Sequence, residues 1–271
     1  MTVTVKTFAR LVDAAAALAS ERGACFLAGG TLVMRAVNEA DPAIETIVRS
    51  TDPSFLNIAV SSGRVELGGG VTMAAILAEH ELTFLHPVAR AVGSPALREA
   101  ATVGGNLFAT RGDFATALLA LDATVMLAGG FGQRELSLDE FMSRRERGAA
   151  LVSAVAFKRP PADALRFTKV TRVHPKGMSV LSIAAQLLPQ ASGRVTGARI
   201  AYAGMAPMPL RAKAAERALE GRTLDAAGIA PALAAAADGT SPADDAIASA
   251  WWRREILPIH LRRLLLGANQ A

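Results

Sequence analysis

The chain has 271 residues, of which 51% are hydrophobic and 20% are charged, and its formal net charge is +5. This composition is typical of an ordered globular protein and excludes a disordered chain, while the single cysteine, Cys25, excludes an internal disulfide and a thiolate cluster. Basic residues are not interleaved with stacking aromatics and no apolar run has membrane-spanning length, so we expect no nucleic-acid or membrane partner and a cytoplasmic location.

Hydrophobic periodicity and turn residues predict alternating helices and strands in the first part of the chain. In chain order we expect a helix over 8–21, a strand over 25–28, a helix over 31–39, strands over 44–48, 56–60 and 64–67, helices over 72–79, 87–100 (interrupted at Ser94-Pro95) and 115–121, a strand over 123–127, a turn at Gly129-Gly130, a helix over 137–142 and a strand over 150–157. Ser137 followed by Glu140 indicates a capping box at the start of the last helix.

Lys158-Arg159-Pro160-Pro161 breaks this pattern, and we place a domain boundary there. The later elements are strands over 165–173, 179–188 and 194–202, then helices over 213–220, 223–237 and 244–266. Three consecutive strands with short turns predict an antiparallel sheet. We therefore expect one domain over 1–160, with subdomains of about 1–53 and 54–160, and a second over 161–271.

Two glycine pairs, Gly29-Gly30 and Gly104-Gly105, carry the clearest chemical signal. Glycine can adopt backbone conformations closed to other residues, so each pair predicts a tight turn at which the chain can lie close to a ligand. Peptide N–H groups at such a turn, with a helix start behind them, can bind phosphate oxygens. The two loops together could hold one diphosphate, as in a dinucleotide.

No other constellation of side chains predicts catalysis. Histidines 80, 86, 174 and 260 lie far apart in the sequence, which gives no metal-ligand spacing, and the chain has no P-loop, no G-x-G-x-x-G motif and no G-x-S-x-G motif. We therefore expect no catalytic residue and no metal site, and a cofactor that carries the reaction.

Ala28-Gly29-Gly30-Thr31 and Thr102-Val103-Gly104-Gly105-Asn106 resemble the two flavin-binding loops of the FAD-binding (medium) subunit of molybdenum hydroxylases, the xanthine dehydrogenase family. Segments 117–125, 198–207 and 248–254 resemble later parts of the same family. The resemblance implies an α+β fold: a PCMH-type FAD-binding domain of two α/β subdomains, followed by a small domain with a three-stranded antiparallel sheet and helices, as in the carbon monoxide dehydrogenase flavoprotein.

The resemblance also implies which residues contact FAD. The residues implied are Ala28, Gly29, Gly30, Thr31 and Leu32 around the diphosphate and ribityl groups, Thr102, Gly104, Gly105 and Asn106 on the other side, Asp113 near the adenosine end, and Leu151 and Lys169 as later contacts.

The function implied by the resemblance is electron transfer within a complex. A large subunit with a molybdenum cofactor would oxidise the substrate, and a small subunit with iron–sulfur clusters would pass electrons to this chain. This chain would deliver them to NAD, oxygen or another acceptor, in a heterotrimer or its dimer. Two alternatives stay open: a stand-alone flavin oxidoreductase, for which no catalytic base is found, and a scaffold subunit with a degenerate flavin site. The second follows from a link before Asp113 that is shorter than usual in the family.

Overall fold

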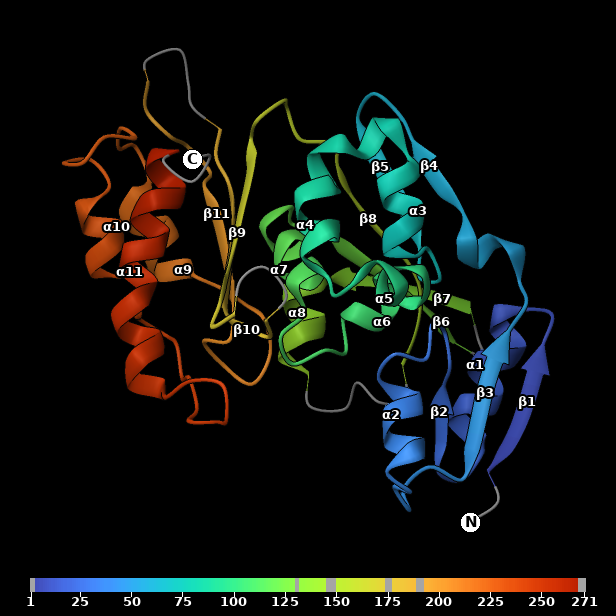
Figure 1. Cartoon of the computed structure of the whole chain (residues 1–271). Helices are drawn as coiled ribbons and strands as arrows, with labels where there is room; N and C mark the ends of the chain where they lie inside the picture. Colours follow the sequence, from blue (N-terminus) through green and yellow to red (C-terminus); the bar gives the residue numbers. More distant parts are fainter. Residues whose placement is uncertain (1–2, 130–131, 145–149, 174–176, 189–192, 268–271) are drawn as a thin grey trace. The chain divides into compact units, whose positions relative to one another are not determined.

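The computed structural model describes residues 3–129, 132–144, 150–173, 177–188 and 193–267. By its contacts the chain divides into two units (Figure 1). The first unit comprises Met1–Ala109 and Ala123–Arg159, and the second comprises Thr110–Asp122 and Pro160–Ala271. Both units mix helices and strands, which confirms the α+β class. The segment Thr110–Asp122 belongs to the second unit, although it precedes the predicted boundary.

A three-stranded parallel sheet in the order β1-β3-β2 opens the first unit. Its elements are β1 (Thr4–Phe8), α1 (Leu11–Ser20), β2 (Ala24–Phe26), α2 (Val33–Asn38) and β3 (Thr46–Ser50). Helix α1 buries Leu11 and Leu18 in a cluster with Val48, as helical spacing predicts. The predicted helix over 8–21 is wrong at its start, because Phe8 ends strand β1 and the extended Arg10 (φ −122°, ψ 140°) separates it from the helix.

The rest of the first unit contains a five-stranded antiparallel sheet in the order β4-β5-β8-β6-β7. Its strands are β4 (Ile58–Val60), β5 (Arg64–Gly68), β6 (Thr124–Gly129), β7 (Gly132–Ser137) and β8 (Leu151–Lys158). The helices are η1 (Pro53–Leu56), α3 (Met73–Ala78), η2 (His80–Leu85), α4 (His86–Ala91), α5 (Pro95–Ala100), α6 (Val103–Asn106) and α8 (Leu138–Ser143). Strands β6 and β7 pair as a hairpin, although no strand was predicted over 132–137, and Gly130 of the predicted turn lies outside the described residues.

Polar side chains cap several of these helices. The hydroxyl of Ser137 accepts the N–H of Glu140 at 3.1 Å, which confirms the first half of the predicted capping box. The carboxylate of Glu140 pairs with Arg144 on the next turn of the chain. Ser94, at the predicted interruption between α4 and α5, caps α5 by accepting the N–H of Leu97 at 3.3 Å.

The second unit is built on an antiparallel sheet in the order β12-β11-β10-β9. Its strands are β9 (Leu165–Thr171), β10 (Ser179–Gln186), β11 (Arg199–Ala203) and β12 (Leu210–Arg211). The predicted antiparallel sheet is confirmed, with a fourth strand of two residues that is too short to give a periodic signal. The strand predicted from 194 begins only at Arg199, because Arg194 forms an isolated bridge with Thr223.

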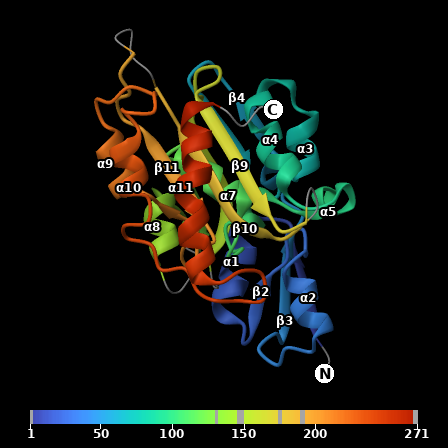
Figure 2. The ribbon, with the colours of Figure 1, turned by 60° about the vertical axis from the view of Figure 1, so that its left-hand side comes forward.

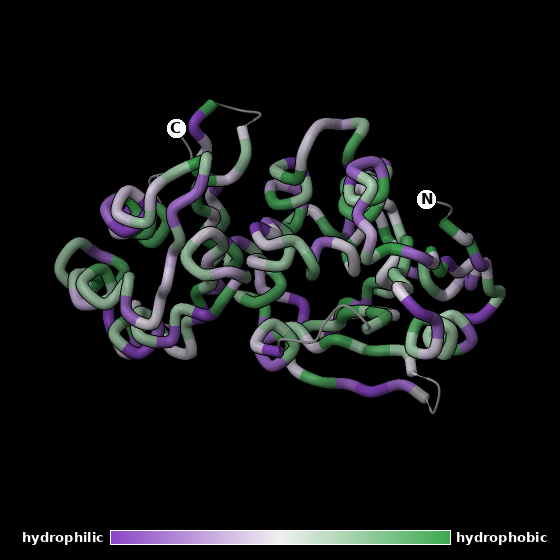
Figure 3. The backbone as a smooth tube through the Cα atoms, turned by 90° about the horizontal axis from the view of Figure 1, so that it is seen from below, coloured by the Kyte–Doolittle hydropathy of each residue, from purple (hydrophilic) through white to green (hydrophobic). Residues whose placement is uncertain are grey.

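Helices cover both faces of this sheet. They are α7 (Asp113–Ala120), α9 (Lys213–Leu219), α10 (Ala230–Ala234) and α11 (Ala250–Leu266). Helix α7 packs against β10 and β11 on one face, and α11 crosses the other (Figures 1 and 2). Strand β10 is buried on both faces. Ile183 packs in the core that includes residues of α11, and its neighbour Ser182 lies on the face that α7 covers. Figure 3 shows hydrophobic and hydrophilic residues alternating around the helices, as expected for helices with one buried side.

Two predicted helices of the second unit are shorter than expected. The helix predicted over 223–237 is reduced to α10, because the Asp225 carboxylate accepts the N–H groups of Ala227 (3.0 Å) and Gly228 (2.8 Å) and so favours a turn. The helix predicted from residue 244 begins at Ala250, after Ser249 as its N-cap. No described helix combines the length and apolar character needed to cross a membrane. The cytoplasmic location expected from the sequence stays a prediction.

The buried hydroxyl of Tyr202 destabilises the core of the second unit. Its hydroxyl is fully buried and has no hydrogen-bond partner within the described part of the chain, and burial together with the charge of Glu216 raises its pKa. A buried, unpaired polar group costs about 1–3 kcal/mol. We expect Tyr202→Phe to raise the free energy of unfolding by about 1 kcal/mol in urea titrations, whereas Tyr202→Ala should lower it. A Phe variant that is less stable than the wild type would contradict this interpretation.

Candidate functional site

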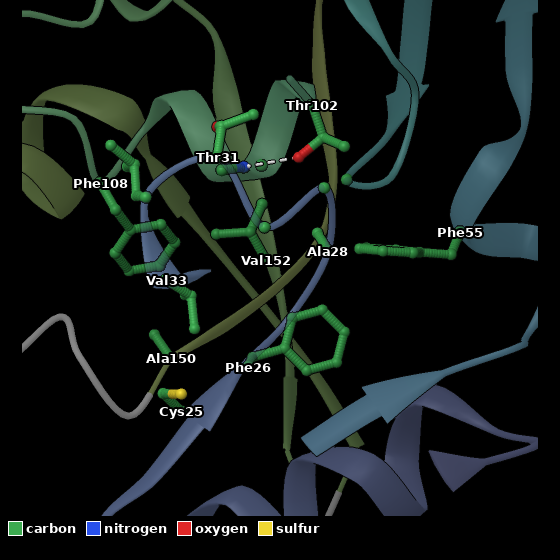
Figure 4. A pocket seen from close by; sticks show the side chains of 16 residues that line it. Cys25, Phe26, Ala28, Thr31, Val33, Phe55, Thr102, Phe108, Ala150 and Val152 are labelled. Atoms are coloured by element: carbon green, nitrogen blue, oxygen red, sulfur yellow. Dashed lines mark hydrogen bonds between the residues drawn. The ribbon is translucent and has the colours of Figure 1, made fainter. Parts of the chain in front are cut away.

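The first unit contains a cavity of about 190 Å³ at the glycine pair that follows strand β2 (Figure 4). Eight of the predicted site residues line it, and they come from both glycine-containing segments: Ala28, Gly29, Gly30, Thr31, Leu32, Thr102, Gly104 and Gly105. The cavity is smaller than the ~300–1,000 Å³ of typical small-molecule pockets, so it can hold one part of an extended dinucleotide. The structure thus brings together the two segments that the sequence singles out.

Glycine is required at both positions of the first pair. Gly30 has φ +75°, in the left-handed region that side chains disfavour. A Cβ atom on Gly29 would lie 1.5 Å from the carbonyl oxygen of Ala100, which leads into the second segment. The missing side chain of Gly29 therefore allows the two segments to pack directly against each other beside the cavity.

Backbone donors of the first segment lie at the cavity without partners. Within the described part of the chain, no acceptor pairs with the N–H groups of Gly29, Gly30, Thr31 or Leu32. Four successive N–H groups without an acceptor, in residues that line the cavity, are donors available to anionic oxygens. Helix α2 has only six residues, so the loop itself, and not the helix start that the sequence suggested, supplies these donors.

The second glycine pair lies in a short helix and not in the predicted tight turn, while its predicted contact with FAD stays a prediction. It does not form a loop of free donors, because Thr102 caps a short helix that contains both glycines. The N–H of Gly105 donates to the Thr102 hydroxyl at 3.1 Å, as Figure 4 shows, and the N–H of Gly104 donates to the carbonyl of Gly69 at 2.8 Å. This segment therefore lines the cavity with backbone whose glycine N–H groups are already bonded, and the available donors come from the first segment.

Two other predicted contacts of the first unit are not among the residues that line the cavity. Asn106 ends α6, and its backbone N–H bonds to the carbonyl of Thr102 at 3.0 Å. Leu151 is 1% exposed and packs in the cluster with Leu11 and Val48, while its neighbours Ala150 and Val152 line the cavity. Their predicted contacts with FAD stay predictions.

Asp113 and Lys169 lie in the second unit and bind each other. The ammonium of Lys169 donates to Asp113 Oδ2 at 2.7 Å, and the hydroxyl of Ser182 donates to Asp113 Oδ1. The side chain of Asp113 is 7% exposed, and that of Lys169 is 17% exposed. The pair joins α7 to the sheet, and we retain its role as a cofactor contact as a prediction. Ser182 was not predicted, because only the pairing of β9 with β10 brings it to this position.

Aromatic and small apolar residues complete the cavity, and the sequence did not identify them. They are Cys25, Phe26, Val33, Phe55, Gly69, Phe108, Ala150 and Val152. Phe26 and Phe55 contact each other edge to face, with ring centroids 5.6 Å apart. Phe26 lies two residues before Ala28 and so could have been identified from the sequence, whereas Phe55 comes from the 3₁₀ helix η1 and Val152 from strand β8. These residues make one side of the cavity apolar (Figure 4).

Titratable groups at the cavity do not form an acid–base pair. Burial raises the pKa of the Cys25 thiol, which keeps it neutral. Among the described residues no cluster of histidine, cysteine or carboxylate side chains could hold a metal ion, and His174 lies outside them. The cavity can therefore bind and orient a ligand, and the expectation that the chain has no catalytic residue stays a prediction.

Two family models together match most of the chain, and they identify it as a flavoprotein with an FAD-binding domain. Residues 3–157 match the family model described as FAD binding domain in molybdopterin dehydrogenase, and residues 167–268 match the CO dehydrogenase flavoprotein C-terminal domain. The chain therefore belongs to the family of FAD-binding subunits of the molybdenum hydroxylases, which are oxidoreductases.

Individual relatives agree with this assignment. The chain is 28% identical over 213 residues to the nicotinate dehydrogenase FAD-subunit of Eubacterium barkeri, covering 73% of this chain and 72% of the relative. It is 27% identical over 228 residues to the 6-hydroxypseudooxynicotine dehydrogenase complex subunit alpha of Paenarthrobacter nicotinovorans, covering 80% and 76%. A chain of the carbon monoxide dehydrogenase of Hydrogenophaga pseudoflava lacking the Mo-pyranopterin moiety has the same fold, with a TM-score of 0.89 at 21% identity over 98% and 96% of the two chains.

Proposed function

We propose that this chain is the electron-transfer subunit of a molybdenum-containing hydroxylase or dehydrogenase. It receives electrons from iron–sulfur clusters of a small partner subunit and delivers them to NAD, oxygen or another acceptor. A large subunit with the molybdenum cofactor oxidises the substrate. Membership of the FAD-binding family supports this proposal, as do two relatives that are named as a dehydrogenase FAD-subunit and a dehydrogenase complex subunit. We propose a heterotrimer or its dimer as the assembly.

The free backbone donors beside the apolar cavity carry the assignment of the FAD site. The N–H groups of Gly29 to Leu32 fit the oxygens of a diphosphate, and the aromatic side chains that line the cavity, such as Phe26 and Phe108, can contact an attached ring. Gly104 and Gly105 allow close approach of the ligand because they present no side chain. Bound FAD supplies reversible redox chemistry that amino-acid side chains lack. The residues of this chain bind it, orient it and exclude water from the apolar side.

A cavity-filling substitution tests this site. In Thr31→Trp the larger side chain enters the cavity, and in Met34→Trp it extends from α2 at a residue that does not line the cavity and is 39% exposed. We expect the wild type and Met34→Trp to bind FAD with equal affinity, measured by absorbance and flavin-fluorescence quenching on the full chain. Thr31→Trp should bind at least about tenfold more weakly, which corresponds to ~1.4 kcal/mol.

Equal affinity of both variants would place the FAD site elsewhere. A wild-type chain that binds no FAD, alone or after reconstitution with the other subunits, would favour the scaffold alternative. Circular dichroism of each variant shows whether a loss of binding reflects loss of the fold.

A further inference from the structure

Helix α11 presents two tryptophans and an isoleucine to solvent in the second unit. Trp251 is 65% exposed, Trp252 48% and Ile259 50%. The indole rings lie 6.1 Å apart, and helical spacing places Ile259 on the same side two turns further on. The opposite side of the helix is buried in the core through residues such as Leu257 and Leu261. We call the exposed side, formed by Trp251, Trp252, Ile259, Arg262 and Arg263, the Trp face.

A groove borders the Trp face. It has a volume of about 350 Å³ and is lined by Trp252 and His260 of α11 together with Arg172 after strand β9. Ile247 and Arg172 also line a neighbouring hollow with Met178, which is 60% exposed. Large exposed apolar side chains beside a groove of this size mark an interaction site, because a partner side chain can be buried there.

The charge of the Trp face is positive. Arg262 and Arg263 are exposed on it, Arg254 is exposed one turn from Trp251, and Glu255 is the acidic residue of the exposed side of α11. Burial, and secondarily the charge of Arg263, lowers the pKa of His260, so the arginines carry the positive charge at neutral pH. Tryptophan, methionine and arginine are the residues enriched at protein interfaces.

We propose that the Trp face is the docking surface for an acidic surface of another protein subunit, whose apolar centre covers Trp251 and Trp252. Charge complementarity favours this occupant, because a second copy of a chain with net charge +5 would bring like charges together. The proposal rests on the proposed function in one respect, that the chain works in a complex. It is independent of the FAD cavity, which is built from the first unit alone.

Site-specific photo-crosslinking in the cells that make the complex tests this surface. The full chain carries benzoylphenylalanine in place of Trp252, or, as a control, in place of the exposed Ala226 before α10. We expect a crosslink from position 252 to an acidic segment of one other subunit, identified by mass spectrometry. Arg262→Glu with Arg263→Glu should lower its yield at least about tenfold, and lysine substitutions in that acidic segment should restore it.

A matched charge change controls for the net charge of the chain. Arg217→Glu with Arg222→Glu alters two exposed arginines of the same unit away from α11 and should leave the crosslink yield unchanged. Crosslinking to a second copy of this chain, to membrane lipid or to no partner would overturn the proposal, as would a yield that the Arg262 and Arg263 changes do not alter. Flavin absorbance is measured separately on the wild type and on each variant. A wild type without bound flavin contradicts the proposed function, whereas a wild type that keeps its flavin but crosslinks to no acidic partner contradicts only the docking surface.

Discussion

Gly29→Ala is expected to destabilise the first unit by more than about 3 kcal/mol and to abolish flavin binding. A Cβ atom there would lie 1.5 Å from the carbonyl oxygen of Ala100 and 2.6 Å from its carbonyl carbon. Both atoms belong to the backbone, so no rotamer change relieves the contact, and the two segments beside the cavity must separate. Thermal unfolding and the ratio of flavin to protein absorbance measure the two effects.

The matched control is Gly63→Ala. A Cβ atom on Gly63 would meet no atom within 4 Å, so this variant should unfold at nearly the wild-type temperature and keep its flavin. Wild-type stability and flavin content in Gly29→Ala would show that the two segments do not make the close approach described above.

Asp113→Ala is expected to destabilise the chain by about 3–5 kcal/mol, because it removes one partner of a buried ion pair. The ammonium of Lys169 would lose its carboxylate partner at 2.7 Å, and the hydroxyl of Ser182 would lose its acceptor. The free energy of unfolding in urea measures this loss. Replacing both charges, in Asp113→Leu with Lys169→Met, should recover much of the stability, because neither variant residue then requires a charged partner.

Asp122→Asn provides the comparison within the same unit, because Asp122 has φ +54° and Asn tolerates this left-handed conformation better than Ala does. Asp122 accepts from Arg199 at 2.8 Å and from Arg211 at 3.2 Å, but its side chain is 51% exposed. Solvent screening limits such a pair, so we expect a loss of at most about 1 kcal/mol. Equal losses at Asp113 and Asp122 would mean that burial does not strengthen the dependence on the Asp113–Lys169 pair. If Asp113→Ala is as stable as the wild type but binds flavin weakly, the carboxylate acts on the cofactor.

Local signals in the sequence predicted most of the elements and much of the cavity. Glycine pairs act through their own backbone, so Gly29 and Gly30 could be identified without tertiary information. The tight turn predicted at Gly104 and Gly105 was wrong, because the hydroxyl of Thr102 and the carbonyl of Gly69 accept their N–H groups within a short helix. Helix propensity predicted too long a helix around residue 225, because the carboxylate of Asp225 stabilises a turn there.

Contacts that depend on the pairing of distant strands could not be predicted from the sequence. Ser182 reaches Asp113 because β10 is central in its sheet and its alternate residues face α7. Phe55 reaches the cavity from the 3₁₀ helix η1, far from the glycine segments in sequence. Such contacts depend on strand order and register, which a periodic pattern of hydrophobic residues does not specify.

The assignment of α7 to the second unit determines how the chain can be dissected. The polypeptide passes between the units at residues 109–110, 122–123 and 159–160, so no single cut separates them. A fragment of residues 161–271 would lack α7, and the side of β10 that carries Ser182 would be open to water. A separate second unit therefore needs residues 110–122 supplied by fusion, and the first unit needs a linker between residues 109 and 123. The second unit also cannot be complete until both parts of the chain that build it have been synthesised.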